Sequence, residues 1–150
     1  MTESHDRPPG TSDATVAAVG KLSEAYEYVI RARGHLYSLH QLMGRADLLF
    51  GDAADALREA GHPELADRVA EEIVGRNVVD GRWTFQVVEE FDDLYFDAAT
   101  EVERAVRDAL VGGRRHVFES ETKDARSTAG APGHERRPPA AHDPRVDTGG

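Results

Sequence analysis

The stretch GHLYSLHQLMGRADLLFG, residues 34–51, constrains the fold more than any other part of this sequence. On a helix that turns about 100° per residue, Leu39, Leu42 and Leu49 lie on one face, and apolar side chains continue around the helix through Phe50. Only a narrow polar strip remains. A helix with so wide an apolar surface must be covered on more than one side. The pattern therefore predicts an all-α protein in which this helix packs against several neighbours or against a second copy of the chain.

The clearest interruption of the helical pattern lies at residues 61–63, close to the middle of the helical region. Gly61 suits the position that follows a helix, where the backbone turns left-handed, and Pro63 suits the first turn of the next helix. We therefore expect a long antiparallel helical hairpin or an up-down helical bundle. Further helix breaks are expected near residue 34 and in the glycine-containing segment 75–81.

Both ends of the chain differ in composition from the helical domain, which we place at residues 13–119. Residues 1–12 are polar and contain two prolines, and residues 120–150 are rich in proline, glycine and charge, with Val146 as their largest aliphatic residue. Such segments bury too little apolar surface to offset the entropy that they lose on ordering. The sequence therefore predicts a disordered tail at each end.

The composition is acidic, with a formal net charge of −10 at pH 7. An acidic surface repels phosphate backbones and anionic lipids, so we expect no nucleic-acid partner and no membrane partner. The chain has no cysteine, which excludes disulfides, thiolate metal sites and cysteine nucleophiles. No apolar run approaches the roughly 18 residues of a membrane span, and the polar first residues do not resemble a secretory signal. We expect a cytoplasmic protein.

Polar residues interrupt the apolar surface of residues 34–51. His40 and Asp47 are seven residues apart and therefore share one face of a helix. A hairpin folded symmetrically about its turn places Arg76 opposite Asp47, and Asp80 follows in the same segment. These four residues, His40, Asp47, Arg76 and Asp80, form the candidate polar cluster. We interpret the cluster as a structural network with an ion pair, and the alternative is a small functional site.

The same helix carries Gly44 and Gly51, one heptad apart and on the same side as His40 and Asp47. A glycine inside a helix costs about 1 kcal/mol relative to alanine, so the close approach of a neighbouring group should explain it. The symmetric hairpin places Trp83 opposite His40 and Gly44. We therefore predict a packing notch formed by Gly44, Gly51 and Trp83.

A metal or catalytic site is the alternative role for these polar residues. Histidine and carboxylates bind first-row metals, which makes His40, Asp47 and Glu72 the candidate ligands if a divalent metal binds. A di-iron bundle needs Glu-x-x-His on two helices, and the sequence does not supply two such motifs, so we expect no cofactor. Arg33 and His40 are separated by six residues, a spacing similar to that of the helical HEPN-type nucleases. His35 lies at the centre of the apolar face and is expected to be a hydrogen-bonded histidine of the core or of a helix junction rather than a ligand.

Three stretches, RARGHLYSLHQLMGRADLLFG, IVGRNVVDGRWTFQVVEEFDD and LVGGRRHVF, resemble a family of small helical proteins of actinobacterial type. The resemblance extends from about Tyr28 to Phe118. That family carries no assigned activity, so the resemblance implies the extent of the helical domain and transfers no functional residue.

The sequence thus favours a non-enzymatic helical interaction or scaffold module. Such a module forms a homo-oligomer or binds a helical protein partner, which covers the apolar surface of residues 34–51. The alternative is a helical-bundle metal binder or enzyme that uses His40, Asp47 and nearby carboxylates. A HEPN-like nuclease is a more remote alternative.

Overall fold

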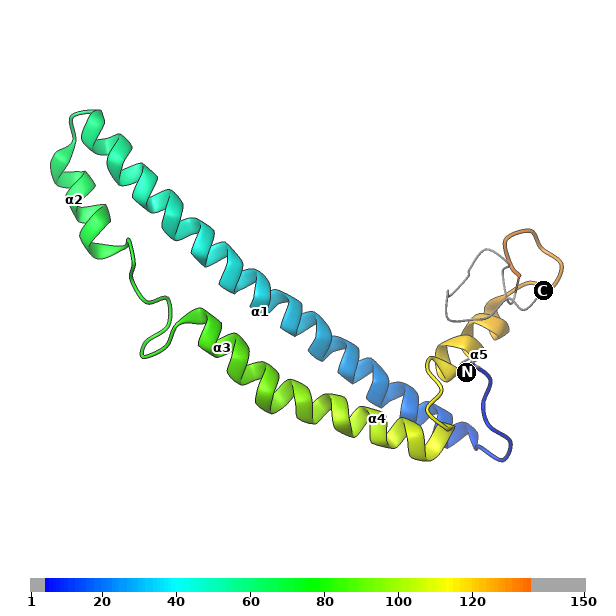
Figure 1. The fold of residues 1–150 in the computed structure, drawn as a ribbon. Coiled ribbons are helices and arrows are strands. Elements are labelled where there is room, and N and C mark those ends of the chain that lie inside the picture. Colours follow the sequence, from blue (N-terminus) through cyan, green and yellow to red (C-terminus); the bar gives the residue numbers. More distant parts are fainter. Residues whose placement is uncertain (1–4, 136–150) are drawn as a thin grey trace, which may run out of the picture. The chain divides into compact units, whose positions relative to one another are not determined.

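The computed structural model describes residues 5–135, and every regular element among them is a helix. The elements are α1 (Asp13–Glu59), α2 (Pro63–Glu72), α3 (Thr84–Glu90), the π-helix η1 (Phe91–Phe96), α4 (Asp97–Val111) and α5 (Val117–Arg126) (Figure 1). Within this part of the chain, extended pairing is limited to an isolated bridge between Val79 and Arg82. The predicted all-α class is therefore confirmed, whereas the hairpin or bundle arrangement stays a prediction.

The long helix α1 is capped at its start and continues without a break. The Ser12 hydroxyl accepts a hydrogen bond from the backbone N–H of Thr15 at 3.1 Å, which caps the first turn. The helix then passes through Gly34 and ends at Glu59, so the predicted break near residue 34 is wrong. One glycine costs only about 1 kcal/mol in a helix, which the surrounding hydrogen-bonded turns outweigh.

A Schellman turn ends α1. The backbone N–H of His62 donates to the carbonyl of Leu57 at 2.9 Å, and that of Gly61 donates to the carbonyl of Arg58 at 3.1 Å. Gly61 has a φ of +87°, which residues with a Cβ rarely adopt. Pro63 then begins α2, where its missing N–H has no intrahelical partner to lose.

An irregular segment, residues 73–83, separates α2 from α3, and the sequence predicts a break there. Gly75 and Gly81 have φ values of +73° and +72°, which end regular helix geometry. The side chain of Gln86 accepts a hydrogen bond from the backbone N–H of Trp83 at 3.0 Å, and this bond closes the first turn of α3. Trp83 is therefore fixed in an extended conformation at the start of a helix.

The chain divides into two compact units, and α1 contributes to both. Unit 1 comprises Met1–Tyr28 and Ala99–Gly150, and unit 2 comprises Val29–Ala98. Unit 1 holds a buried cluster of valines, with one partly buried valine packed against it: Val16, Val19, Val111 and Val117, with Val106 beside them. Figure 1 shows α2 and α3 following one another along the part of α1 that belongs to unit 2.

Packing in unit 1 is close enough to require a glycine. Gly20 is buried in α1, and a Cβ at this position would lie 2.8 Å from the Cβ and Cγ of Phe118 in α5. Real Cβ contacts are not that short, so α1 and α5 approach here only because residue 20 has no side chain.

The described ends of the chain are attached to unit 1. Arg7 donates from Nε and Nη2 to the two carboxylate oxygens of Glu121, at 2.6 and 2.8 Å, and α5 continues to Arg126. Helix α5 therefore continues past residue 119, the predicted end of the helical domain. An ion pair between residues 114 positions apart leaves no local sequence pattern. The predicted tails also include residues 1–4 and 136–150, which lie outside the described residues.

Unit 2 leaves much of its apolar surface uncovered. The buried hydrophobic residues of this unit are Ala54, Ala66 and Val88, and none of them is large. His35 is exposed, so the prediction that it lies in a core is wrong. The physical reason is that no element of the unit covers the face of α1 on which Leu42 is also exposed.

Candidate functional site

The predicted polar cluster is divided between separate places in unit 2. His40 Nδ1 lies 2.7 Å from the Oγ1 of Thr84, and this hydrogen bond joins α1 to the first residue of α3. His40 also lines a cavity of only about 20 Å³, together with apolar residues such as Leu36 and Val87. This space is close to the size of a single water molecule. It is too small for a substrate.

Asp47 fixes the irregular segment to α1 through a backbone group. Its Oδ1 accepts a hydrogen bond from the N–H of Gly75 at 2.7 Å. Arg76 instead extends its Nη1 to within 3.4 Å of the carbonyl oxygen of Glu72. The predicted Asp47–Arg76 ion pair is therefore wrong, because Asp47 faces the residue before Arg76 and bonds to its backbone. Asp80 is exposed and lies apart from these contacts.

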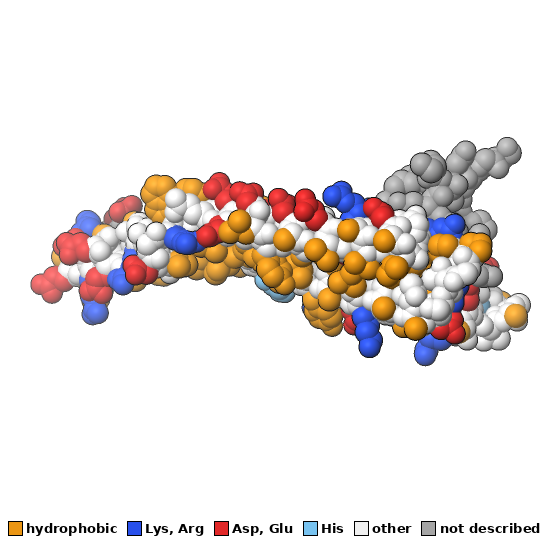
Figure 2. Space-filling model, turned by 90° about the horizontal axis from the view of Figure 1, so that it is seen from below, with side chains coloured by type: hydrophobic (Ala, Val, Ile, Leu, Met, Phe, Trp, Pro, Cys, Tyr) orange, Lys and Arg blue, Asp and Glu red, His pale blue; other side chains and the backbone are white. Residues whose placement is uncertain are grey.

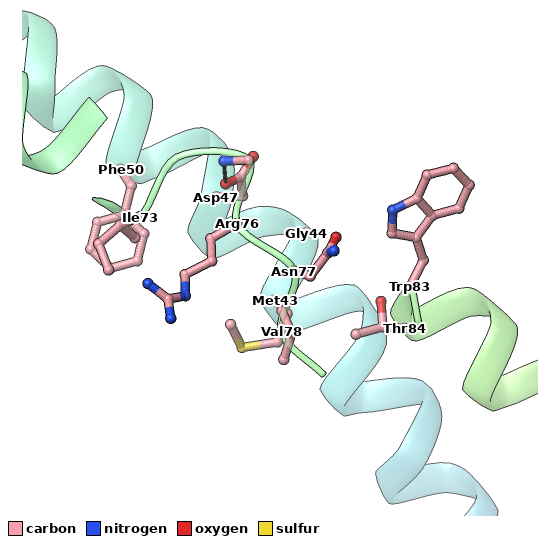
Figure 3. A pocket seen from close by; sticks show the side chains of 11 residues that line it. Met43, Gly44, Asp47, Phe50, Ile73, Arg76, Asn77, Val78, Trp83 and Thr84 are labelled. Carbon is pink, nitrogen blue, oxygen red and sulfur yellow. Dashed lines mark hydrogen bonds between the residues drawn. The ribbon is translucent and has the colours of Figure 1, made fainter. Parts of the chain in front are cut away.

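Asp47 and Arg76 do line a common cavity, which lies between α1 and the irregular segment 73–83 (Figure 3). The cavity is open on one side and has a volume of about 510 Å³, within the roughly 300–1,000 Å³ of typical ligand pockets. Its walls are mainly apolar and are formed by Met43, Phe50, Ile73, Val78 and Trp83. We call this space the α1 cavity. Its apolar lining with two charged groups suits an apolar occupant with a polar edge.

The predicted packing notch is not filled within this chain. A Cβ at Gly44 or at Gly51 would meet no other atom within 4 Å, so no neighbour of either glycine requires its small size. Gly44 and Trp83 both line the α1 cavity, but Figure 3 shows the indole of Trp83 pointing away from α1. Its ring packs on Phe85 instead, with ring centroids 5.1 Å apart. The prediction of direct Trp83–Gly44 packing is wrong for the single chain.

A second polar group, which the sequence pattern did not reveal, joins α1 to η1. Arg33 donates from Nε and Nη2 to the two carboxylate oxygens of Asp92, at 2.7 and 3.1 Å, and its guanidinium lies 4.6 Å from the ring centroid of Phe96. The Tyr37 hydroxyl donates to Asp92 at 2.7 Å. The hydrogen bonds from Arg33, and then that from Tyr37, hold the pKa of Asp92 below its ordinary value. The same bond to Asp92 raises the pKa of Tyr37.

No known protein family, no curated protein and no solved structure matches the chain.

The resemblance to an actinobacterial helical family therefore stays a prediction. Among the described residues, no helix combines the length and apolarity needed to cross a membrane.

The candidate metal ligands of unit 2 already have protein partners. One oxygen of Asp47 and the Nδ1 of His40 are hydrogen bonded as described above, and Glu72 forms an exposed ion pair with Arg68 at 2.9 Å. In the part of the chain that the structure describes, these three residues do not gather into a group that could hold an ion.

A different group of potential ligands lies in unit 1. Glu27, His116 and Glu119 each offer one ligand atom, and these atoms lie within 4.8 Å of one another. All three side chains are exposed, and exposed acidic groups of this kind are common without a bound ion. The group joins α1 to the start of α5, which local sequence patterns cannot reveal.

The polar side chains of unit 2 connect its elements. His40, Asp47 and Arg33 each form a hydrogen bond from α1 to another part of the unit, and of these three only Asp47 lines the α1 cavity. The open features of the unit are its apolar side chains and the α1 cavity.

Proposed function

We propose that this chain is a non-enzymatic helical interaction module that self-associates through the part of α1 in unit 2. The observation that carries the proposal is a row of apolar residues, most of which are exposed. We call this row the α1 seam, and it consists of Leu39, Leu42, Ala46, Leu49 and Ala53. Its three leucines are 44%, 66% and 49% exposed. Fully burying a leucine side chain contributes roughly 1.5–3 kcal/mol, so an uncovered row favours association.

The spacing of the α1 seam matches that of a helix that packs along another helix. Successive members are three, four, three and four residues apart, which is the pattern of the a and d positions of a coiled coil. Leucines act as knobs in such a contact, and the alanines allow close approach. A second copy carries the same seam, so two copies can bury equivalent residues against each other about a two-fold axis.

The distribution of charge on the surface supports the same proposal. On the face drawn in Figure 2, hydrophobic side chains lie exposed along the middle, and acidic side chains gather along one margin. An interface of this kind buries an apolar centre and keeps its charged rim in water.

Sedimentation velocity of the full chain over a wide concentration range tests this proposal. We expect a concentration-dependent homo-oligomer for the wild type. Leu42→Gln should weaken association at least tenfold with little change in unfolding, because Leu42 is already exposed in the single chain. Leu94→Gln is the matched control, because Leu94 is 64% exposed and lies outside the seam. A chain that stays monomeric at all concentrations would contradict self-association.

The metal binder or enzyme proposed as the alternative from the sequence has its own test. Elemental analysis of protein purified without chelator, for the wild type and for His40→Ala, measures whether a metal depends on this histidine. Stoichiometric metal that disappears in the variant would favour the alternative.

A further inference from the structure

We infer that the α1 cavity is filled by Trp83 from a second copy of the chain, and that this exchange is reciprocal. The inference rests on the proposed self-association and adds a contact on the other side of α1, because Gly44 lies roughly 140–180° around the helix from the residues of the α1 seam. The cavity, the residue that enters it and the charges beside it all lie in unit 2.

Gly44 is the first observation in favour of an occupant from outside the chain. It lies inside α1 and has no left-handed backbone conformation that would call for glycine. No atom of the chain lies within 4 Å of the position of its absent Cβ. Glycine destabilises a helix. Where no contact within the chain requires the glycine, we expect another molecule to approach the helix backbone at that position. Gly44 is part of the wall of the cavity, so an entering group would meet the bare backbone there.

Trp83 is the second observation. Its side chain is 57% exposed at the edge of the α1 cavity, and its indole points away from α1. Exposed indoles are unusual in a monomer, whereas buried tryptophans are among the commonest dominant contacts of protein interfaces. The capping hydrogen bond from the Trp83 backbone to Gln86 and the packing on Phe85 hold the side chain in a defined place. A fixed aromatic group of this kind loses little entropy on binding.

Two features indicate that the occupant comes from the same protein. A two-fold interface uses one patch on both copies, so the patch must present both the group that inserts and the space that receives it. The surface around residues 73–83 presents both. It also carries opposite charges without salt-bridge partners among the described residues, Arg76 and Asp80. When two such segments meet antiparallel, Arg76 of each copy lies near Asp80 of the other, which gives charge complementarity within an acidic protein.

Fluorescence of the native chain tests the inference directly, because Trp83 is the single tryptophan of the sequence. Its emission is recorded across the same dilution series that is used for sedimentation velocity. We expect the emission maximum to move to shorter wavelength as the oligomer forms, with the same midpoint in both measurements, since each Trp83 leaves water when it enters a cavity.

A variant that fills the cavity gives the second arm of the test. Gly44→Leu places a side chain where the single chain has open space, so it should fold at least as stably as the wild type. It should raise the dissociation constant at least tenfold and leave the Trp83 emission at long wavelength. Gly51→Leu is the matched control, because Gly51 has equally open surroundings in α1 and does not line the cavity. It should keep both the association and the shift in emission.

The possible outcomes separate this inference from the proposed function. An oligomer whose Trp83 emission does not move overturns the insertion and leaves self-association standing. Equal effects of Gly44→Leu and Gly51→Leu also overturn the insertion at this cavity. A chain that is monomeric at every concentration overturns both.

Discussion

The two units of this chain differ in how they cover the apolar residues of their helices. In unit 1, four valines are buried together and Gly20 is required for the contact with Phe118. In unit 2, the leucines of the α1 seam are exposed and Gly44 has no neighbour. The same helix, α1, contributes to both arrangements. The comparison shows that unit 1 buries a cluster of valines, whereas in unit 2 the leucines of α1 stay exposed.

Buried polar groups follow the same division. Glu103 is buried in unit 1, where it accepts hydrogen bonds from Ser23 at 3.1 Å and from the Nε of Arg107 at 3.0 Å. Arg107 also donates to the carbonyl of Gly113 at 2.6 Å. In unit 2, the pair of Arg68 with Glu72 is largely exposed, whereas the pair of Arg33 with Asp92 is partly buried. The most buried ion pair among the described residues, Arg107 with Glu103, therefore lies in unit 1.

The largest expected effect follows from this buried pair. Arg107→Ala leaves the Glu103 carboxylate buried without its cation, which should lower the free energy of unfolding by about 3 kcal/mol. Urea unfolding monitored by circular dichroism measures this loss. Arg68→Ala removes the arginine of an exposed pair in unit 2 and should cost less than about 1 kcal/mol. Equal losses in the two variants would remove the energetic distinction between the units.

Glycine substitutions should have opposite signs in the two units. Gly20→Ala places a methyl group 2.8 Å from Phe118 and should destabilise unit 1 by roughly 1–3 kcal/mol, although alanine favours helix. Gly51→Ala meets open space and should stabilise α1 by up to about 1 kcal/mol. Thermal unfolding of both variants beside the wild type provides the comparison. A gain in stability from Gly20→Ala would show that unit 1 is more loosely packed than its contacts indicate.

The smallest effect concerns acid stability in unit 2. The pKa of Asp92 is lowered in the folded state, so its bonds to Arg33 and Tyr37 contribute stability above the unfolded pKa of about 3.9. This contribution is lost as the pH falls through the lower pKa of the folded state. Asp92→Asn should therefore be less stable than the wild type at neutral pH, and the difference should shrink toward pH 2. The urea unfolding midpoints of both proteins, measured across this pH range, test the prediction. A difference between the two midpoints that stays constant at all pH values would contradict it.

Local features of the fold could be predicted from the sequence. Gly61 and Pro63 mark the end of α1 and the start of α2, and the wide apolar surface of residues 34–51 indicates a helix that needs several neighbours. Helix periodicity and turn chemistry act over about four residues, so they are visible in one sequence. The continuous helix at Gly34 is also a local feature. It could not be predicted reliably from the sequence, because one glycine changes the free energy of a helix by only about 1 kcal/mol.

Long-range pairing could be predicted only approximately. A symmetric hairpin places Arg76 opposite Asp47, and the structure places Gly75 there instead. The same symmetric hairpin places Trp83 opposite His40, whereas in the structure His40 forms a hydrogen bond with Thr84. Each difference is one residue. On a helix or a tight turn, one residue redirects a side chain by about 100°, which is enough to replace an ion pair with a backbone hydrogen bond.

The sequence by itself thus determined that this protein is helical, where its long helix ends and which part of that helix carries a wide apolar surface. The tertiary structure alone decided which apolar residues are covered within the chain. Val16 and Val19 are buried because α4 and α5 supply valines at the same place, whereas Leu42 and Leu49 have no such neighbours. Burial depends on residues distant in the sequence, so apolar residues of α1 form a buried cluster in unit 1 and an open surface in unit 2.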